Sequence, residues 1–148
     1  AMLEAADLVV AGKHQEIVQD EDKASYEGWC KDKEAQINWH AHIDHIYNLI
    51  RGCDPAPGAW TTIGGIKVRI YETRKHPVRR FEDVRGKPGE ISAIGEKGVS
   101  VIVQGGQVEL LKVKPEGGAK VSAAEFFTSI GFNVGNALTD PLPLPEAA

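Results

Sequence analysis

Short alternating strands around paired glycines constrain the fold of this chain more than any other feature. Residues 66–71 alternate apolar with polar side chains, which is the pattern of a half-buried β-strand. A second alternating run at 99–103 leads into Gly105-Gly106 and then into the strand-like segment 107–114. Two such runs around a glycine pair predict a β-hairpin. The chain is therefore expected to be mostly β.

Two more segments extend the predicted sheet. Residues 60–63 precede Gly64-Gly65 and should form a hairpin with 66–71, and Ile91 and Ile94 mark one more short strand. About five short strands would leave exposed edges unless the sheet closes on itself. We therefore expect a mostly β fold with flanking helices, in the form of a small OB-like β-barrel.

Helices are predicted at three places. The clearest begins near residues 38–40 and ends at Arg51-Gly52, because four apolar side chains recur at helical spacing: Ile43, Ile46, Tyr47 and Ile50. A capping box at 122–125 opens a short helix that buries Phe126, Phe127 and Ile130. Residues 3–11, which end at Gly12, have the pattern of the last turns of a helix.

Charge and periodicity divide the chain. Residues 1–34 hold nine acidic and four basic side chains, and residues 13–34 show no regular period. We expect residues 1–12 to end a preceding helix, 13–34 to be a linker, 35–135 to fold as one domain, and the proline-rich residues 136–148 to form a flexible tail.

A basic segment runs against the overall charge. The chain has a formal net charge of −4, yet residues 74–89 carry +4. Clustered Arg and Lys side chains suit the phosphates of a nucleotide or an RNA, and the alternative is a solvated loop that pairs with the acidic linker. The candidate polyanion-binding residues are Arg74, Lys75, Arg79, Arg80, Arg85 and Lys87, with Glu82 and Asp83 as the only acids among them.

No catalytic or metal-binding set is predicted. His40, His42 and His45 form H-x-H-x-x-H, but no fourth ligand has convincing spacing, so we interpret them as solvent-facing histidines. A Cys53–His45 nucleophile–base pair has no support in the spacing. The phosphate loops and hydrolase motifs are missing from the sequence.

The sequence also indicates a compartment. No apolar run approaches the roughly 18–20 residues that span a bilayer, so no membrane role is expected. The N-terminal residues lack the cationic region of a signal peptide. Cys30 and Cys53 are then expected to be free thiols in a cytoplasmic protein.

Five segments in a fixed order carry a family resemblance: residues 37–39, 43–51, 57–61, 86–91 and 117–126. Together they resemble the C-terminal domain of the 10-formyltetrahydrofolate-dependent formyltransferases, and the likeness covers residues from about 37 to 128. We interpret its structural motif as helix-end and turn determinants: Asn48, Arg51, Pro57, Gly58, Ala59 and Trp60. In that family the domain has an OB-like barrel fold.

The resemblance implies an accessory role. The family's folate site and its catalytic Asn, His and Asp belong to an N-terminal domain that no part of this chain matches. The implied partner is that catalytic domain, 10-formyltetrahydrofolate is the cofactor of the parent enzyme, and no cofactor is expected in this chain itself. The chain alone is expected to be inactive, while the parent is a formyltransferase or a hydrolase.

The acceptor stays open at this point. The motifs at residues 51–54 and 59–61 look more like the dehydrogenase and hydrolase branch of the family. One alternative is a tRNA-binding domain of a methionyl-tRNA formyltransferase, for which the basic segment would be the contact surface. Another is a purely structural spacer between domains.

Overall fold

The computed structural model describes residues 1–80 and 85–140 and contains one antiparallel sheet of six strands. The strand order is β1-β2-β5-β4-β3, and β6 pairs with β5 outside this path. The strands are β1 (Ala59–Ile63), β2 (Ile66–Pro77), β3 (Ile91–Ile94), β4 (Val99–Val103), β5 (Gly106–Pro115) and β6 (Val121–Ser122). The helices are α1 (Met2–Val10), α2 (Ile43–Cys53) and α3 (Ala123–Ser129), with a short 3₁₀ turn at Glu21–Lys23.

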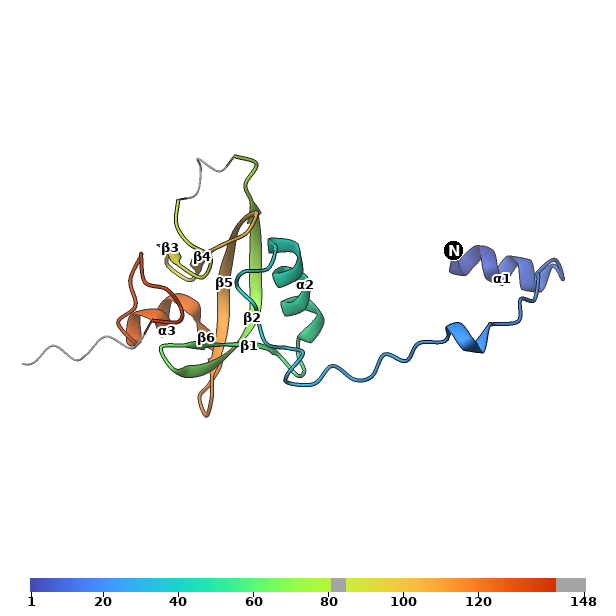
Figure 1. Ribbon diagram of the computed structural model, residues 1–148, viewed down its shortest axis with the longest axis horizontal. Helices are drawn as coiled ribbons and strands as arrows, with labels where there is room; N and C mark the ends of the chain where they lie inside the picture. Colours follow the sequence, from blue (N-terminus) through green and yellow to red (C-terminus); the bar gives the residue numbers. More distant parts are fainter. Residues whose placement is uncertain (81–84, 141–148) are drawn as a thin grey trace, which may run out of the picture.

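Both predicted hairpins are confirmed. β1 pairs with β2 across Gly64-Gly65, and β4 pairs with β5 across the Gln104–Gly105 turn, each in an antiparallel register. The two long strands β2 and β5 then pair with each other and form the spine of the sheet (Figure 1). The register shifts between Ile70 and Thr73, where β2 carries an irregularity. The mostly β class with flanking helices is therefore confirmed.

The sheet does not close into a barrel through its strands. β1 and β3 are the two ends of the strand path, and within the described residues no ladder joins them. The C-terminal segment lies between these ends instead. Leu138 accepts a hydrogen bond from the Gly64 amide (3.2 Å) and donates one to the Gly89 carbonyl (2.9 Å). A segment that is not a strand therefore covers part of the sheet edges, which we predicted to be removed by closure of a barrel. The fold is mostly β as predicted, but its sheet is not a closed OB-like barrel.

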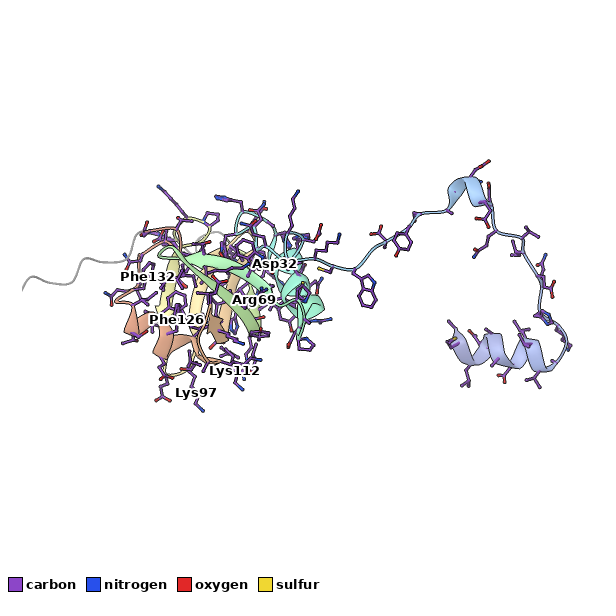
Figure 2. The ribbon with its side chains drawn as sticks, turned by 90° about the horizontal axis from the view of Figure 1, so that it is seen from below. Asp32, Arg69, Lys97, Lys112, Phe126 and Phe132 are labelled. Atoms are coloured by element: carbon purple, nitrogen blue, oxygen red, sulfur yellow. The ribbon has the colours of Figure 1, made fainter. Side chains whose placement is uncertain are left out.

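The core lies between the sheet and the helices. Val68, Ile70 and Val101 point inward and are fully buried, and α2 contributes Ile43, Ile46 and Ile50, as its predicted apolar face requires. Under α3, Phe127 packs edge-on against both Phe126 and Phe132. Figure 2 shows Phe126 and Phe132 on this side of the domain.

The start of α2 differs from the prediction. The helix begins at Ile43 and not near residues 38–40. The Asn38 side chain accepts a hydrogen bond from the His40 amide, and the Asn38 carbonyl accepts one from the Ala41 amide, so this stretch forms a turn. His42 is the N-cap, and its Nδ1 accepts from the Asp44 amide. Local side-chain bonds of this kind compete with helix formation.

The N-terminal region lies apart from the sheet. All residues of α1 are exposed, and Figure 1 shows the helix at the far end of an extended segment. This segment contains residues 13–34, and their role as a linker stays a prediction. Residues 141–148 of the predicted tail, like Glu82 and Asp83 of the basic segment, lie outside the described residues. Among residues 1–80 and 85–140, no helix combines the length and the apolar character that crossing a bilayer requires.

Candidate functional site

The described residues of the basic segment lie on β2, directly after β2 and before β3. Arg74 and Lys75 lie in the second half of β2, while Arg79 and Arg80 follow its end at Pro77. Arg85 and Lys87 come from the chain that approaches β3. All six candidate side chains are exposed.

One of these six cations is already neutralised. Lys75 Nζ lies 2.7 Å from Asp44 Oδ1 and 5.3 Å from the centroid of the Tyr47 ring on α2. The hydrogen bond from Lys75 holds the pKa of Asp44 below its usual value. Lys75 therefore links β2 to α2 and contributes less than its formal charge to anion binding.

The other five cations form no ion pair with any residue in the described ranges. They are Arg74, Arg79, Arg80, Arg85 and Lys87. Glu109, which stands opposite Arg74 in the strand register, is paired with His76 at 3.0 Å. Exposed guanidinium groups of this kind are available to phosphate oxygens.

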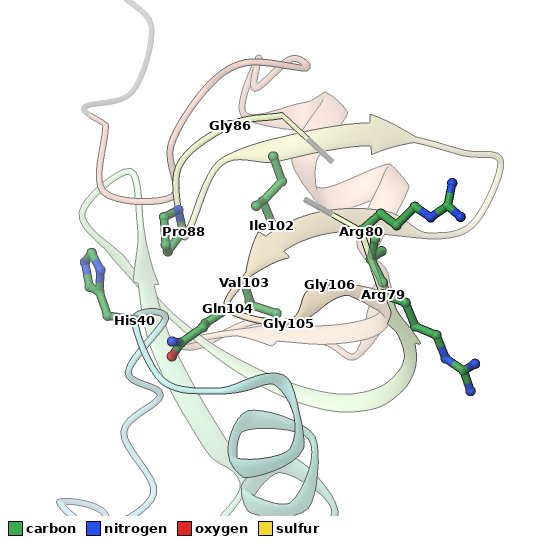
Figure 3. Close-up of a pocket in the computed structure, with 11 residues that line it drawn as sticks. His40, Arg79, Arg80, Gly86, Pro88, Ile102, Val103, Gln104, Gly105 and Gly106 are labelled. Carbon is green, nitrogen blue, oxygen red and sulfur yellow. The ribbon is translucent and has the colours of Figure 1, made fainter. Parts of the chain in front are cut away.

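Beside these cations lies a cavity of about 450 Å³. Its apolar floor is formed by Val78, Ile102 and Val103, and its rim by His40, Arg79, Arg80, Gly86, Pro88 and the turn 104–106. Figure 3 shows Ile102 pointing into the cavity and the guanidinium groups of Arg79 and Arg80 pointing outward. The arrangement is an apolar hollow with a cationic edge.

Backbone geometry fixes the shape of this cavity. Gly86 has a φ of +146°, and a Cβ at this position would collide with the Ile102 side chain. Gly105 has a φ of +93° and lies against His42 Nε2. These positions tolerate only glycine without rearrangement, because the φ angles favour glycine and the space is filled.

The polar side chains at the cavity are all exposed. They are His40, Arg79, Arg80 and Gln104. No cluster of three His, Cys, Asp or Glu side chains suited to a metal occurs in residues 1–80 and 85–140. The three histidines lie in different places. His40 lies at the cavity rim, His42 caps α2, and His45 lies on the exposed surface of that helix.

The family-like motif builds the point where the linker joins the domain. Gly58 has a φ of +82°, and a Cβ there would press against the Tyr71 hydroxyl and the Arg69 side chain. Arg69 donates from one guanidinium nitrogen to the carbonyls of Pro57 (2.8 Å) and Gly58 (2.9 Å). Ala59 is fully buried. The interpretation of Gly58 as a turn determinant agrees with this geometry.

The same motif anchors Asp32. The Trp60 indole donates to the Asp32 carbonyl (2.6 Å), and the Asp32 carboxylate pairs with Lys67 and, at 2.8 Å, with Arg69. Figure 2 shows Asp32 and Arg69 side by side where the extended segment meets the domain. This Asp32 anchor fixes the exit of the linker. Asn48 and Arg51 are exposed, Arg51 lies over the Tyr47 ring, and their role as a tie between helix and sheet stays a prediction.

The Asp32 anchor should weaken in acid. Hydrogen bonds from Lys67 and Arg69 lower the pKa of Asp32 from its usual 3.8. A lowered folded-state pKa means that the stabilisation is present above pH 3.8 and is lost as the pH falls through the folded value. We expect Asp32→Asn to lower the melting temperature at pH 7, and we expect this difference to shrink as the pH falls below 3.8. Melting curves of both proteins across this range would check it, and an equal loss at both ends would contradict it.

The sequence did not predict a second cation-lined groove of about 580 Å³. Arg51, Lys112 and Lys120 line it together with Tyr71, and Lys120 Nζ lies 3.7 Å from the centroid of the Tyr71 ring. Asp54 and Glu72 also line the groove, and Glu72 pairs with Lys112. The cations come from α2, β5 and the turn after it, so only the folded chain brings them together.

The described residues therefore form an antiparallel-sheet domain with a cationic edge. Residues 30–131 match the family model described as "Formyl transferase, C-terminal domain", and the chain belongs to this family. The predicted family resemblance is thereby confirmed.

Two curated relatives come from different branches of the family. Methionyl-tRNA formyltransferase from Streptococcus pneumoniae is 32% identical over 130 residues, which cover 88% of this chain and 40% of that protein. The human mitochondrial 10-formyltetrahydrofolate dehydrogenase is 33% identical over 138 residues, which cover 87% of this chain and 14% of that protein. The chain thus spans less than half the length of these relatives.

A solved structure shares the fold. HypX from Aquifex aeolicus in complex with tetrahydrofolic acid matches with a TM-score of 0.61 over 99% of this chain and 25% of that one. The sequence identity is 19%, so this match supports the fold alone.

Proposed function

We propose that this chain is a non-catalytic accessory domain of a 10-formyltetrahydrofolate-dependent formyltransferase or hydrolase, where it orients the catalytic domain or the acceptor substrate. The observation that carries this proposal is the match of residues 30–131 to a C-terminal family domain while the curated relatives are more than twice as long. The folate cofactor and the reacting residues would then belong to the catalytic domain. A cytoplasmic location accords with the two free thiols.

The helix α1 supports an N-terminal catalytic domain as the partner. Its apolar side chains Met2, Leu3 and Val10 are 80–89% exposed, and Leu8 and Val9 are about half exposed. A helix with a wholly exposed apolar surface gains little stability by itself, and it is normally stabilised by packing against another element. The catalytic domain of the parent enzyme is the proposed packing surface.

The first test is activity. We expect the purified chain to show no formyl transfer from, and no hydrolysis of, 10-formyltetrahydrofolate, because residues 30–131 match a C-terminal family domain and the chain spans only 40% of a full-length relative. Spectrophotometric release of tetrahydrofolate measures this directly. Turnover that is abolished by a point substitution within the chain would refute the accessory role.

A tRNA acceptor is the second candidate, and it is favoured by the five cations of the basic segment that form no ion pair with another described residue. Each neutralised phosphate releases counterions, so log K should fall with log salt by about 0.7–0.9 per contact. Replacing Arg74, Arg79 and Arg80 with Ser should reduce this slope by roughly two to three. The melting temperature should hardly change, because all three side chains are exposed.

The measurement is a titration of labelled initiator tRNA and bulk tRNA at several salt concentrations. The matched control replaces Lys33, Lys97 and Lys114 with Ser, which removes the same charge from exposed positions outside the basic segment. Absence of binding to either RNA at low salt would leave a structural spacer as the better account. If both triple variants weaken tRNA binding equally, only the net charge matters. If the Arg74/Arg79/Arg80 variant leaves the salt slope unchanged, the contact would lie instead at the groove of Arg51, Lys112 and Lys120.

A further inference from the structure

Two cysteines that lie 23 positions apart in the sequence meet where the linker joins the domain. Cys30 Sγ and Cys53 Sγ are 3.8 Å apart. Cys53 is the last residue of α2 and is 2% exposed, while Cys30 is exposed on the chain that leads to the Asp32 anchor. One thiol is therefore held in place by the domain, and the other is open to solvent.

This geometry is close to that of a disulfide. An S–S bond is about 2.05 Å long, so the sulfurs would have to approach by roughly 1.8 Å. The Cys53 carbonyl is held by a 2.8 Å hydrogen bond from the Gly58 amide, which fixes the end of α2. The movement would come from Cys30, whose side chain makes only a 3.9 Å contact with the Lys31 carbonyl besides its contact with Cys53.

We propose that Cys30 and Cys53 form a redox modification site, at which low-molecular-weight disulfides oxidise the pair to an intrachain disulfide that clamps the linker to α2. In the first step the Cys30 thiolate attacks one sulfur of the small disulfide, whose S–S bond breaks and releases one thiol. In the second step Cys53 gives its proton to solvent and attacks Cys30 Sγ, which releases the second small thiol. Two protein thiols are oxidised, and one small disulfide is reduced to two thiols.

The order of the steps follows from the burial of the two thiols. A small disulfide reaches the exposed Cys30 first, because Cys53 is enclosed by the core. Burial, together with the neighbouring Cys30, raises the pKa of the Cys53 thiol to about 11. Since the thiolate is the attacking species, the second step should be slow at neutral pH. The rate of this step should rise about tenfold per pH unit between about pH 7 and pH 9.

The experiment incubates the 148-residue chain with oxidised glutathione, quenches with acid, and follows the products by intact mass and non-reducing peptide mapping. The expected final product is a monomer that has lost two hydrogens, with the Cys30 and Cys53 peptides joined. Its rate of formation from the mixed disulfide should show the stated pH dependence. A stable glutathione adduct on Cys30, or a dimer joined through Cys30, would overturn the proposal.

Two variants test whether the disulfide forms because Cys30 and Cys53 lie close together or only because an exposed thiol is reactive. Cys53→Ser should stop at one glutathione adduct, because the resolving thiol is gone. A Cys30→Ser/Ser25→Cys double variant keeps an exposed thiol on the same segment but moves it five positions away from the contact. It should also accumulate the adduct. An intrachain disulfide in the double variant at the wild-type rate would show that the observed contact has no part in the reaction.

Discussion

Val101→Asp is expected to unfold the domain or to destabilise it by about 4 kcal/mol or more. Val101 is fully buried on β4, between Ile91 of β3 and Val108 of β5 in the strand register. A carboxylate at this position would have no partner in an apolar core, and an isolated buried charge is among the most costly changes. Since domains of this size are stable by roughly 5–15 kcal/mol, most of the stability would be lost.

Denaturant unfolding followed by tryptophan fluorescence would measure this loss. The matched control is Thr62→Asp, which places the same group on an exposed position of β1 opposite Lys67. This control should stay within about 0.5 kcal/mol of the unsubstituted chain. Similar losses in the two variants would mean that the inward face of the sheet has been assigned wrongly.

Local patterns predicted most of the sheet because each hairpin is specified by nearby residues. Period-two alternation places Val68 and Val101 on the buried face, and glycine pairs mark both turns. The segment that lies between the two open ends of the sheet could not be predicted in this way. It contains Leu138, which is far from β1 in the sequence and bonds to the Gly64 amide through its backbone carbonyl.

The alternating pattern predicts which strand residues are buried, but it does not predict the contacts of the outward-facing ones. Arg69 alternates with the buried Val68 and Ile70, and the pattern alone marks it as a replaceable surface residue. In the folded chain its guanidinium holds the carbonyls of Pro57 and Gly58 and the carboxylate of Asp32. The sequence contained only a weak signal for this role, the unusual Pro57-Gly58 turn.

The candidate site was predicted as a charge pattern and not as a geometry. The six cations of residues 74–87 were identified from composition. The ion pair between Lys75 and Asp44 could not be identified in this way, because it depends on the packing of α2 on β2. The cavity beside Arg79 and Arg80 requires the turn 104–106, which is distant in sequence. The contact of Cys30 with Cys53 has the same origin, because neither cysteine lies in a motif that predicts the other.

The second large effect is expected at the turn where β4 meets β5. Gly106 has a φ of +149°, and a Cβ built on it would collide with the His76 carbonyl oxygen and approach Pro77 Cα to 3.0 Å. Both neighbours are backbone atoms of β2, in the paired region where Pro77 faces Gly106. They cannot move without breaking the pairing of β2 and β5, which forms the spine of the sheet.

Gly106→Ala should therefore destabilise the chain by about 3 kcal/mol, near the upper end of ordinary point substitutions. Gly117→Ala is the matched control, because Gly117 also has a positive φ (+75°) but would meet no atom within 4 Å of a new Cβ. The control gives the cost of a left-handed backbone without any collision, about 1 kcal/mol. The difference between the two variants in denaturant unfolding then measures the collision with β2 together with the strain of the φ of +149° at residue 106. Equal losses would show that the backbone angle alone requires glycine at residue 106, and that the end of β2 yields to a methyl group at the edge of the cavity.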